Sequence, residues 1–98
     1  MMIIVLGKFP AVYQGKEEEF EKWFNWSNQL LKGTPGLISR RLVKDRTGNY
    51  FAIVEFDSFD AFKAMHSSDV HKLIHKKASL LLNGMPKPEI FEVINTIS

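Results

Sequence analysis

Apolar and polar positions recur along the chain at two different spacings, which predicts a mixture of strands and helices. A β-branched run that begins at Ile3 predicts a strand over about 3–13. From residue 16 to 32 the apolar positions recur at helical spacing, and Gly33 follows as a stop signal. The buried stripe of this helix is expected to comprise Phe20, Trp23, Phe24, Ser27, Leu30 and Leu31.

The middle of the chain predicts a β-hairpin. One strand is expected over 37–43 and its partner over 50–56, with residues 45–48 forming the turn between them. A four-residue loop that contains a glycine is typical of two antiparallel neighbours. These two strands are therefore expected to lie side by side in the sheet.

Serines mark the starts of two further helices. Ser58 is expected to cap a short one, and Ser67 or Ser68 a second one, because a serine oxygen can accept a hydrogen bond from a free amide in the first turn. Residues 83–84, Asn-Gly, are expected to end the second helix, and a last strand follows over 88–94. The expected core positions are Phe59, Phe62 and Met65 in the first of these helices, and Val70, Leu73, Ile74, Ala78 and Leu81 in the second.

The resulting order of elements is β-α-β-β-α-β, with the second helix interrupted near Ser67. This is the order of the ferredoxin-like split βαβ motif. The sequence therefore predicts an α+β fold in which four antiparallel strands carry the helices on one face. A length of 98 residues is typical of one domain, and we expect a single domain over 1–98.

The predicted strands are apolar on both faces. The first strand places Ile3 and Val5 on one side and Ile4 and Leu6 on the other, and the strand over 50–56 has the same character. Helices cover only one face of such a sheet, and a large bare apolar face is uncommon in a monomer. We expect two copies to pack sheet against sheet in a homodimer. The alternative is that a loop or a terminus covers this face.

Composition narrows the classes of function. The chain is 45% hydrophobic and has a formal net charge of +2, which is typical of a folded domain and too small an excess to indicate nucleic-acid binding by itself. It contains no cysteine, so neither a disulfide nor a thiolate is available. No apolar run approaches the roughly 20 residues of a membrane span, and residues 1–10 do not resemble a signal peptide. We expect a cytoplasmic protein with no membrane partner.

Most motifs of well-known chemistry are missing. The sequence has no GxGxxG, Walker A, HExxH or nucleophile-elbow pattern. An RNA-binding ferredoxin-like domain would present basic and aromatic side chains on its strands, whereas the strand over 50–56 carries Glu55 and no Lys or Arg. We therefore expect no nucleic-acid partner.

Three histidines, His66, His71 and His75, fall within ten residues. His71 and His75 are four positions apart on the predicted helix and therefore share a face. One interpretation is a solvated basic helix face, since several lysines surround them. A zinc site is a second interpretation, although these lysines repel cations and no cysteine can complete the usual four ligands. The third is that one histidine, with His75 as our choice, faces a cavity as a general base or an axial ligand.

Several segments form a set of structural motifs: residues 33–37 (GTPGL), 48–58 (GNYFAIVEFDS) and 61–64 (AFKA), followed by 90–93 (IFEV). Together they resemble the antibiotic biosynthesis monooxygenase domain, a family of small dimeric α+β barrels, over nearly the whole chain. The resemblance implies a homodimer with one pocket per subunit between sheet and helices. Some members of the family oxidise polycyclic aromatic phenols with O2 and need no metal, haem or flavin. A second branch binds haem and degrades it.

The resemblance also implies positions for a site. His75 falls where the haem branch has its proximal histidine, and Phe24 falls where it has a pocket aromatic. Met65 stands in place of that branch's pocket Trp, and Lys8 in place of its distal Asn. These two departures put haem degradation of the usual kind in question.

Our first hypothesis is an oxygenase that acts on a small, flat, electron-rich aromatic with O2 and needs no metal or flavin. His75 or His66 would be the catalytic base. The residues expected to contact the substrate are Lys8, Phe24, Phe51, Met65 and His71. The alternatives are a haem-binding or haem-degrading protein and a non-catalytic dimeric ligand-binding module.

Overall fold

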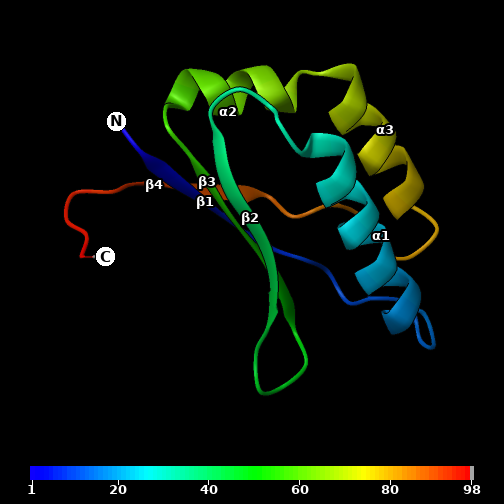
Figure 1. Ribbon diagram of the computed structural model, residues 1–98. Coiled ribbons are helices and arrows are strands. Elements are labelled where there is room, and N and C mark those ends of the chain that lie inside the picture. The colour runs from blue at the N-terminus through cyan, green and yellow to red at the C-terminus, as the bar shows by residue number, and fades with distance from the viewer. Residues whose placement is uncertain (98) are drawn as a thin grey trace.

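The fold is a four-stranded antiparallel sheet with three helices. This structure, a computed structural model, describes residues 1–97. The elements are β1 (Ile3–Lys8), α1 (Glu17–Leu31), β2 (Leu37–Lys44), β3 (Tyr50–Phe56), α2 (Phe59–His66), α3 (Asp69–Ala78) and β4 (Pro88–Glu92). The strand order is β2-β3-β1-β4 (Figure 1), which confirms the predicted ferredoxin-like α+β fold. Ser98, the last residue of the predicted domain, lies outside the described residues.

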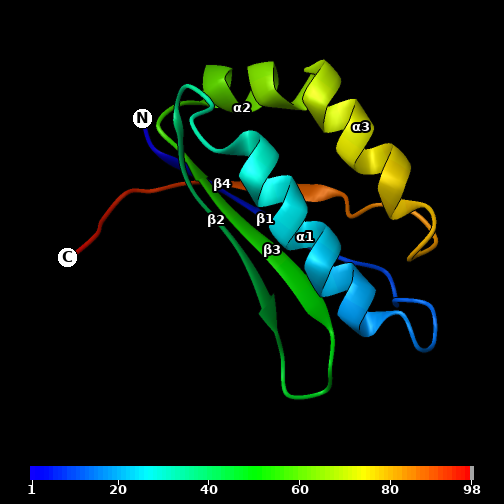
Figure 2. The ribbon, with the colours of Figure 1, turned by 45° about the vertical axis from the view of Figure 1, so that its right-hand side comes forward.

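The helices lie on one face of the sheet. In Figure 2, α1 runs alongside the sheet, and α2 and α3 follow one another at an angle in the same layer. Every second residue of β1 and of β3 is buried, and the residues between them are less so. Val5 pairs with Val54 on the buried side, and Leu6 pairs with Ile53 on the side that carries no helix. The two-residue period of the strands therefore defines an inner face and an outer face.

Side-chain caps set the starts of the short helices. The hydroxyl oxygen of Ser58 accepts a hydrogen bond from the amide of Ala61 at 3.1 Å, and that of Ser68 accepts one from the amide of His71 at 3.2 Å. Each cap satisfies an amide that has no partner within its helix. Ser68 is therefore the cap of α3, whereas the hydroxyl of Ser67 donates back into α2.

Three predicted boundaries are wrong. β1 ends at Lys8 instead of residue 13, because Pro10 has no amide to donate to a neighbouring strand. Beyond it only an isolated bridge joins Val12 to Leu82. α3 ends at Ala78 instead of residues 83–84, because the amides of both Leu81 and Leu82 turn back to the Ala78 carbonyl. β4 ends at Glu92 and does not reach residue 94.

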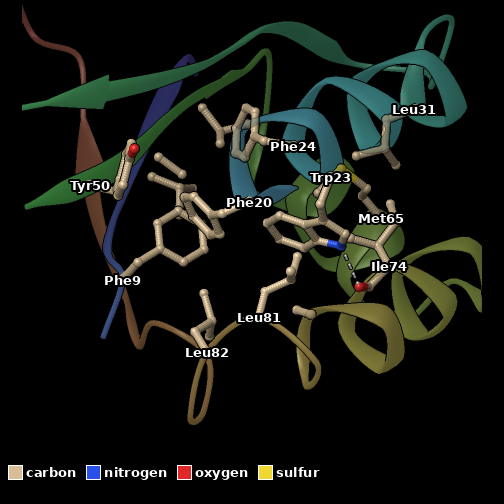
Figure 3. Close-up of a cluster of buried hydrophobic side chains, with 14 of the residues drawn as sticks. Phe9, Phe20, Trp23, Phe24, Leu31, Tyr50, Met65, Ile74, Leu81 and Leu82 are labelled. Carbon is tan, nitrogen blue, oxygen red and sulfur yellow. Dashed lines mark hydrogen bonds between the residues drawn. The ribbon is translucent and has the colours of Figure 1, made fainter. Parts of the chain in front are cut away.

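The predicted core stripe of α3 is also wrong in part. Val70 and Leu73 are 40% and 45% exposed, whereas His71 is buried together with Ile74 and Ala78. The indole Nε1 of Trp23 donates a hydrogen bond to the carbonyl of Ile74 at 3.1 Å, drawn as a dashed line in Figure 3. A buried indole needs such an acceptor, and this bond ties α3 to α1. In this orientation of α3, His71 lies on the buried side of the helix.

Aromatic rings fill the core beneath α1 (Figure 3). Phe9 meets Phe20 edge to face with ring centroids 5.0 Å apart, and Phe20 stacks on Trp23 at 5.5 Å. Tyr50 lies against Phe20, and its hydroxyl donates to a carboxylate oxygen of Glu21 at 2.5 Å. Burial and this hydrogen bond raise the pKa of Tyr50 to about 12, so its phenol stays protonated at neutral pH. In α1 the predicted stripe is buried except for Leu30, which is 41% exposed.

Candidate functional site

A small cavity lies between the inner face of the sheet and the helices. Its volume is about 80 Å³. Much of its lining is apolar and includes Val5, Trp23, Val54, Met65 and Ile74 from strands and helices, and Phe9 just after β1. The polar part of the lining consists of Arg40, His66, His71 and His75. An apolar pocket with a few convergent polar groups is the usual form of a ligand site.

The three histidines form a row along this cavity. The ring centroids of His66 and His71 are 4.3 Å apart, and those of His71 and His75 are 4.2 Å apart. The ring of Phe62 continues the row next to His66, at 4.3 Å. The break between α2 and α3 allows this arrangement, since His66 is the last residue of α2 while His71 and His75 are one turn apart on α3.

Burial lowers the pKa of all three imidazoles. For His71 the pKa falls to about 4, mainly through desolvation and further through the charges of His66, His75 and Arg40. Desolvation is also the main cause for His66 and His75, and the positive charge of Arg40 acts in the same direction on both. All three rings are therefore predominantly neutral at pH 7, and a neutral imidazole can accept a proton.

Arg40 is the charged group of the cavity wall. It lies in β2 opposite Val54, on the inner face. Its Nη1 donates hydrogen bonds to the hydroxyl of Ser27 at 2.6 Å and to the amide oxygen of Asn28 at 2.7 Å, both on α1. The guanidinium carbon lies 4.1 Å from the ring centroid of Phe24. Burial lowers the pKa of Arg40 to about 10, so the group stays cationic at neutral pH.

The structure brings four of the seven predicted site residues together. His66, His71, His75 and Met65 all line the cavity. Phe24 is buried beneath the guanidinium of Arg40 and does not itself line the cavity.

Lys8 and Phe51 are placed elsewhere and do not belong to the cavity. They pair with each other across β1 and β3 on the outer face, with the ammonium nitrogen of Lys8 6.0 Å from the Phe51 ring centroid. The reason is the strand period: Gly7 and Ala52 are the neighbours that point inward. We therefore withdraw these two residues from the candidate site.

Sequence reasoning missed Arg40. A charged residue in a strand is normally taken to face water, and Arg40 instead faces the helices. The available signal was that Arg40 lies two residues before Leu42, so both side chains point to the same, inner face of β2. An irregularity in the pairing between Leu37 and Ser39 hides the alternation that would have revealed it.

The described residues contain neither a metal-binding cluster nor a membrane-spanning helix. Within residues 1–97, no three side chains of the metal-ligating types are arranged to hold an ion. In the same part of the chain, no helix has the length and apolar character needed to cross a bilayer.

The sequence profile described as antibiotic biosynthesis monooxygenase matches residues 2–77 of the chain. The chain belongs to this family. No curated protein matches it at a significant level. Family membership is thus established by a match over most of the length, and it agrees with the position of the cavity between sheet and helices.

Solved structures of the antibiotic biosynthesis monooxygenase fold resemble the chain closely. A Caulobacter crescentus protein that carries the family's name is 27% identical, with a TM-score of 0.84 over 96% of this chain and 91% of that one. SnoaB from Streptomyces nogalater, a cofactor-independent oxygenase, is 18% identical, with a TM-score of 0.82 over 98% and 96% of the two chains. Rv0793 from Mycobacterium tuberculosis is 12% identical, with a TM-score of 0.83 over the whole of both chains. At the lower identities the likeness concerns the fold alone.

Proposed function

We propose that this protein is a cofactor-independent oxygenase that acts on a small electron-rich aromatic. The observation that carries the proposal is the row of three neutral imidazoles along an apolar cavity. Membership of the antibiotic biosynthesis monooxygenase family and the likeness in fold to SnoaB support it. The chemistry needs a base to ionise the substrate and an apolar enclosure for the reactive anion, and the cavity contains both kinds of group.

The reaction would begin with proton transfer from a phenol or quinol hydroxyl to His66 or His75. The electron-rich anion then reduces O2 directly, and a new carbon–oxygen bond forms. Cleavage of the O–O bond leaves one oxygen atom in the product and releases the other as water. When a hydroquinone becomes a hydroxyquinone in this way, the substrate supplies all four electrons, so no other reductant is required.

The size of the cavity limits the substrate. A volume of about 80 Å³ is well below the roughly 300–1,000 Å³ of common ligand pockets. We therefore propose a substrate with one ring instead of a polycyclic one. Some widening is still needed, and the side chain of Met85 and the ring of Pro86, both in the loop before β4, belong to the part of the lining that lies outside the sheet and the helices.

Oxygen consumption by the purified protein tests this function. A panel of one-ring quinols, dihydroxybenzoates and larger anthrones is incubated with the protein, and O2 uptake is followed with an electrode. We expect O2 uptake with the one-ring quinols. The double variant His66→Gln/His75→Gln should lose at least about tenfold in the rate of uptake, and Lys72→Gln, on the exposed side of α3, should lose none. Absence of uptake across the panel would rule the proposal out.

We also propose that the protein is a homodimer that buries the outer face of the sheet. Four apolar side chains of this face, Ile4, Leu6, Phe51 and Ile53, are only partly covered within one chain. Nearer its edges, Val43 and Phe91 are 37% and 48% exposed. A second copy would cover these side chains if the same outer face of both subunits packed together about a two-fold axis. A cytoplasmic location is part of the same proposal.

Haem binding is the less favoured alternative. A cavity of about 80 Å³ is far smaller than a tetrapyrrole, and the ring of His75 lies against that of His71, with centroids 4.2 Å apart. Titration with hemin distinguishes the two: a Soret band that His75→Ala abolishes would support the haem alternative. For the non-catalytic ligand-binding module, binding of a quinol without O2 uptake would be the corresponding result.

A further inference from the structure

We propose that the cavity is an anion site in which Arg40 holds the carboxylate of a small aromatic acid. The inference rests on the proposed function only in treating this ligand as a substrate, since binding itself can be measured without turnover. It narrows the substrate class from electron-rich aromatics in general to one-ring hydroxylated aromatic acids.

The first argument is the balance of charge around the cavity. Its wall contains the Arg40 guanidinium and three imidazoles but neither an aspartate nor a glutamate. Among the described residues, no carboxylate lies within ion-pair distance of Arg40. By contrast, the adjacent Arg41 forms an ion pair with Glu55 at 3.2 Å on the outer face. A partly buried cation without a counter-ion is costly, and a bound anion would remove that cost.

The second argument is the hydrogen bonding of the guanidinium. Within the described part of the chain, Nη1 alone donates side-chain hydrogen bonds, to Ser27 and Asn28. Nε and Nη2 therefore stay available, and these two nitrogens form one edge of the planar fork. Two parallel donors on one edge match the two oxygens of a carboxylate. Stacking on Phe24 and the bonds to α1 hold the group in place before a ligand arrives.

The third argument is the row of imidazoles. The charge of Arg40 contributes to lowering the pKa of His66, His71 and His75, so an anion beside Arg40 would oppose that effect. Binding would then take up protons and strengthen as the pH falls. The other residues that line the cavity from β1, α1 and β3, among them Val5, Trp23 and Val54, carry no titratable group. The same positive charge disfavours a metal cation at the imidazoles.

Binding of benzoate tests the proposal, with benzamide as a neutral ligand of nearly the same shape. Isothermal titration calorimetry at pH 7 and pH 5.5 gives the dissociation constants. We expect benzoate to bind, benzamide to bind at least about tenfold more weakly, and benzoate to bind severalfold more tightly at pH 5.5. NMR titration of the three histidines should show their pKa values rising when benzoate is present.

Variants identify the group that binds the anion. Arg40→Met keeps an unbranched side chain over Phe24 but removes the charge, and it should weaken benzoate binding by about 10- to 100-fold. Arg41→Met is the matched control and should leave binding unchanged, because Arg41 faces the other side of the sheet. Arg40→Lys guards against misfolding, since it retains the charge and should bind benzoate with intermediate affinity.

The possible failures are distinguishable. Equal affinities for benzoate and benzamide, or unchanged benzoate binding in a folded Arg40→Met, would overturn the anion site while leaving the oxygenase proposal intact. Benzoate binding without O2 uptake from any dihydroxybenzoate or quinol would overturn the oxygenase proposal and leave the anion site intact. Uptake with a dihydroxybenzoate that exceeds uptake with the matching quinol would support both.

Discussion

Replacing His71 with leucine tests the electrostatics of the cavity most directly. His71 is 9% exposed, makes no side-chain hydrogen bond among the described residues, and has a pKa lowered from 6.5 to about 4. The unfolded chain binds a proton at this position more readily than the folded one does between those two values. The free energy of unfolding must therefore decrease as the pH falls through this window.

The size of the effect follows from the two pKa values. At pH 5 protonation favours the unfolded state about 30-fold, which corresponds to about 2 kcal/mol, while at pH 7 the effect is below about 0.2 kcal/mol. A small domain of this length loses about 4–8 °C of melting temperature per kcal/mol. The wild-type protein should therefore melt roughly 10 °C lower at pH 5 than at pH 7 through this residue alone.

Urea denaturation at pH 7 and pH 5, at one fixed protein concentration, measures the effect. His71→Leu should be close to wild type at pH 7 and more stable than wild type at pH 5. The matched control, Leu73→His, adds an imidazole on the exposed side of the same helix and should leave the pH dependence unchanged. If His71→Leu lost as much stability between pH 7 and pH 5 as the wild type, His71 would not be the buried neutral group described above.

Three further substitutions test other parts of the structure. Gly36→Ala should destabilise the fold by about 2–4 kcal/mol in urea denaturation, because Gly36 has a φ of +80° and an added methyl would collide with the Cβ of Ala61. Ser68→Ala should lower the free energy of unfolding by about 1 kcal/mol through loss of the hydrogen bond from the His71 amide, and Ser68→Asp should retain most of it. Ile53→Glu, on the outer face, should convert the proposed dimer to a monomer, as measured by light scattering. Unchanged stability in Gly36→Ala would contradict the close contact with Ala61, and unchanged stability in Ser68→Ala would contradict the cap. A dimer that persists in Ile53→Glu would contradict packing through the outer face.

The strands were predictable because their side-chain period is two. The alternation in β1 and β3 separates inner from outer residues, and it places Lys8 on the outer face even though a family resemblance suggested a pocket role for it. The cap at Ser58 was predictable in the same way, since a serine before an apolar helical stretch can satisfy a free amide, whereas for the next helix the sequence left Ser67 and Ser68 open and the structure selects Ser68.

The inward side of α3 was not predictable by counting apolar residues. Val70 and Leu73 offer one apolar stripe, while Ile74 and Ala78 belong to another that also contains His71. The choice between them depends on contacts across the fold, such as the bond from Trp23 to the Ile74 carbonyl. Local sequence contains no record of such contacts, so the histidine row became visible only in three dimensions.

The interruption between α2 and α3 has a consequence for how this chain can tolerate changes of length. In one unbroken helix, residues five apart point about 140° away from each other, so His66 and His71 would face different directions. The break at residues 67–68 changes the direction of the helix and brings both rings to the same side of the cavity. Adding or deleting a single residue there would turn α3 by about 100° and displace the imidazoles together with the buried Ile74 and Ala78, whereas the exposed hairpin turn at 45–49 should tolerate insertions better.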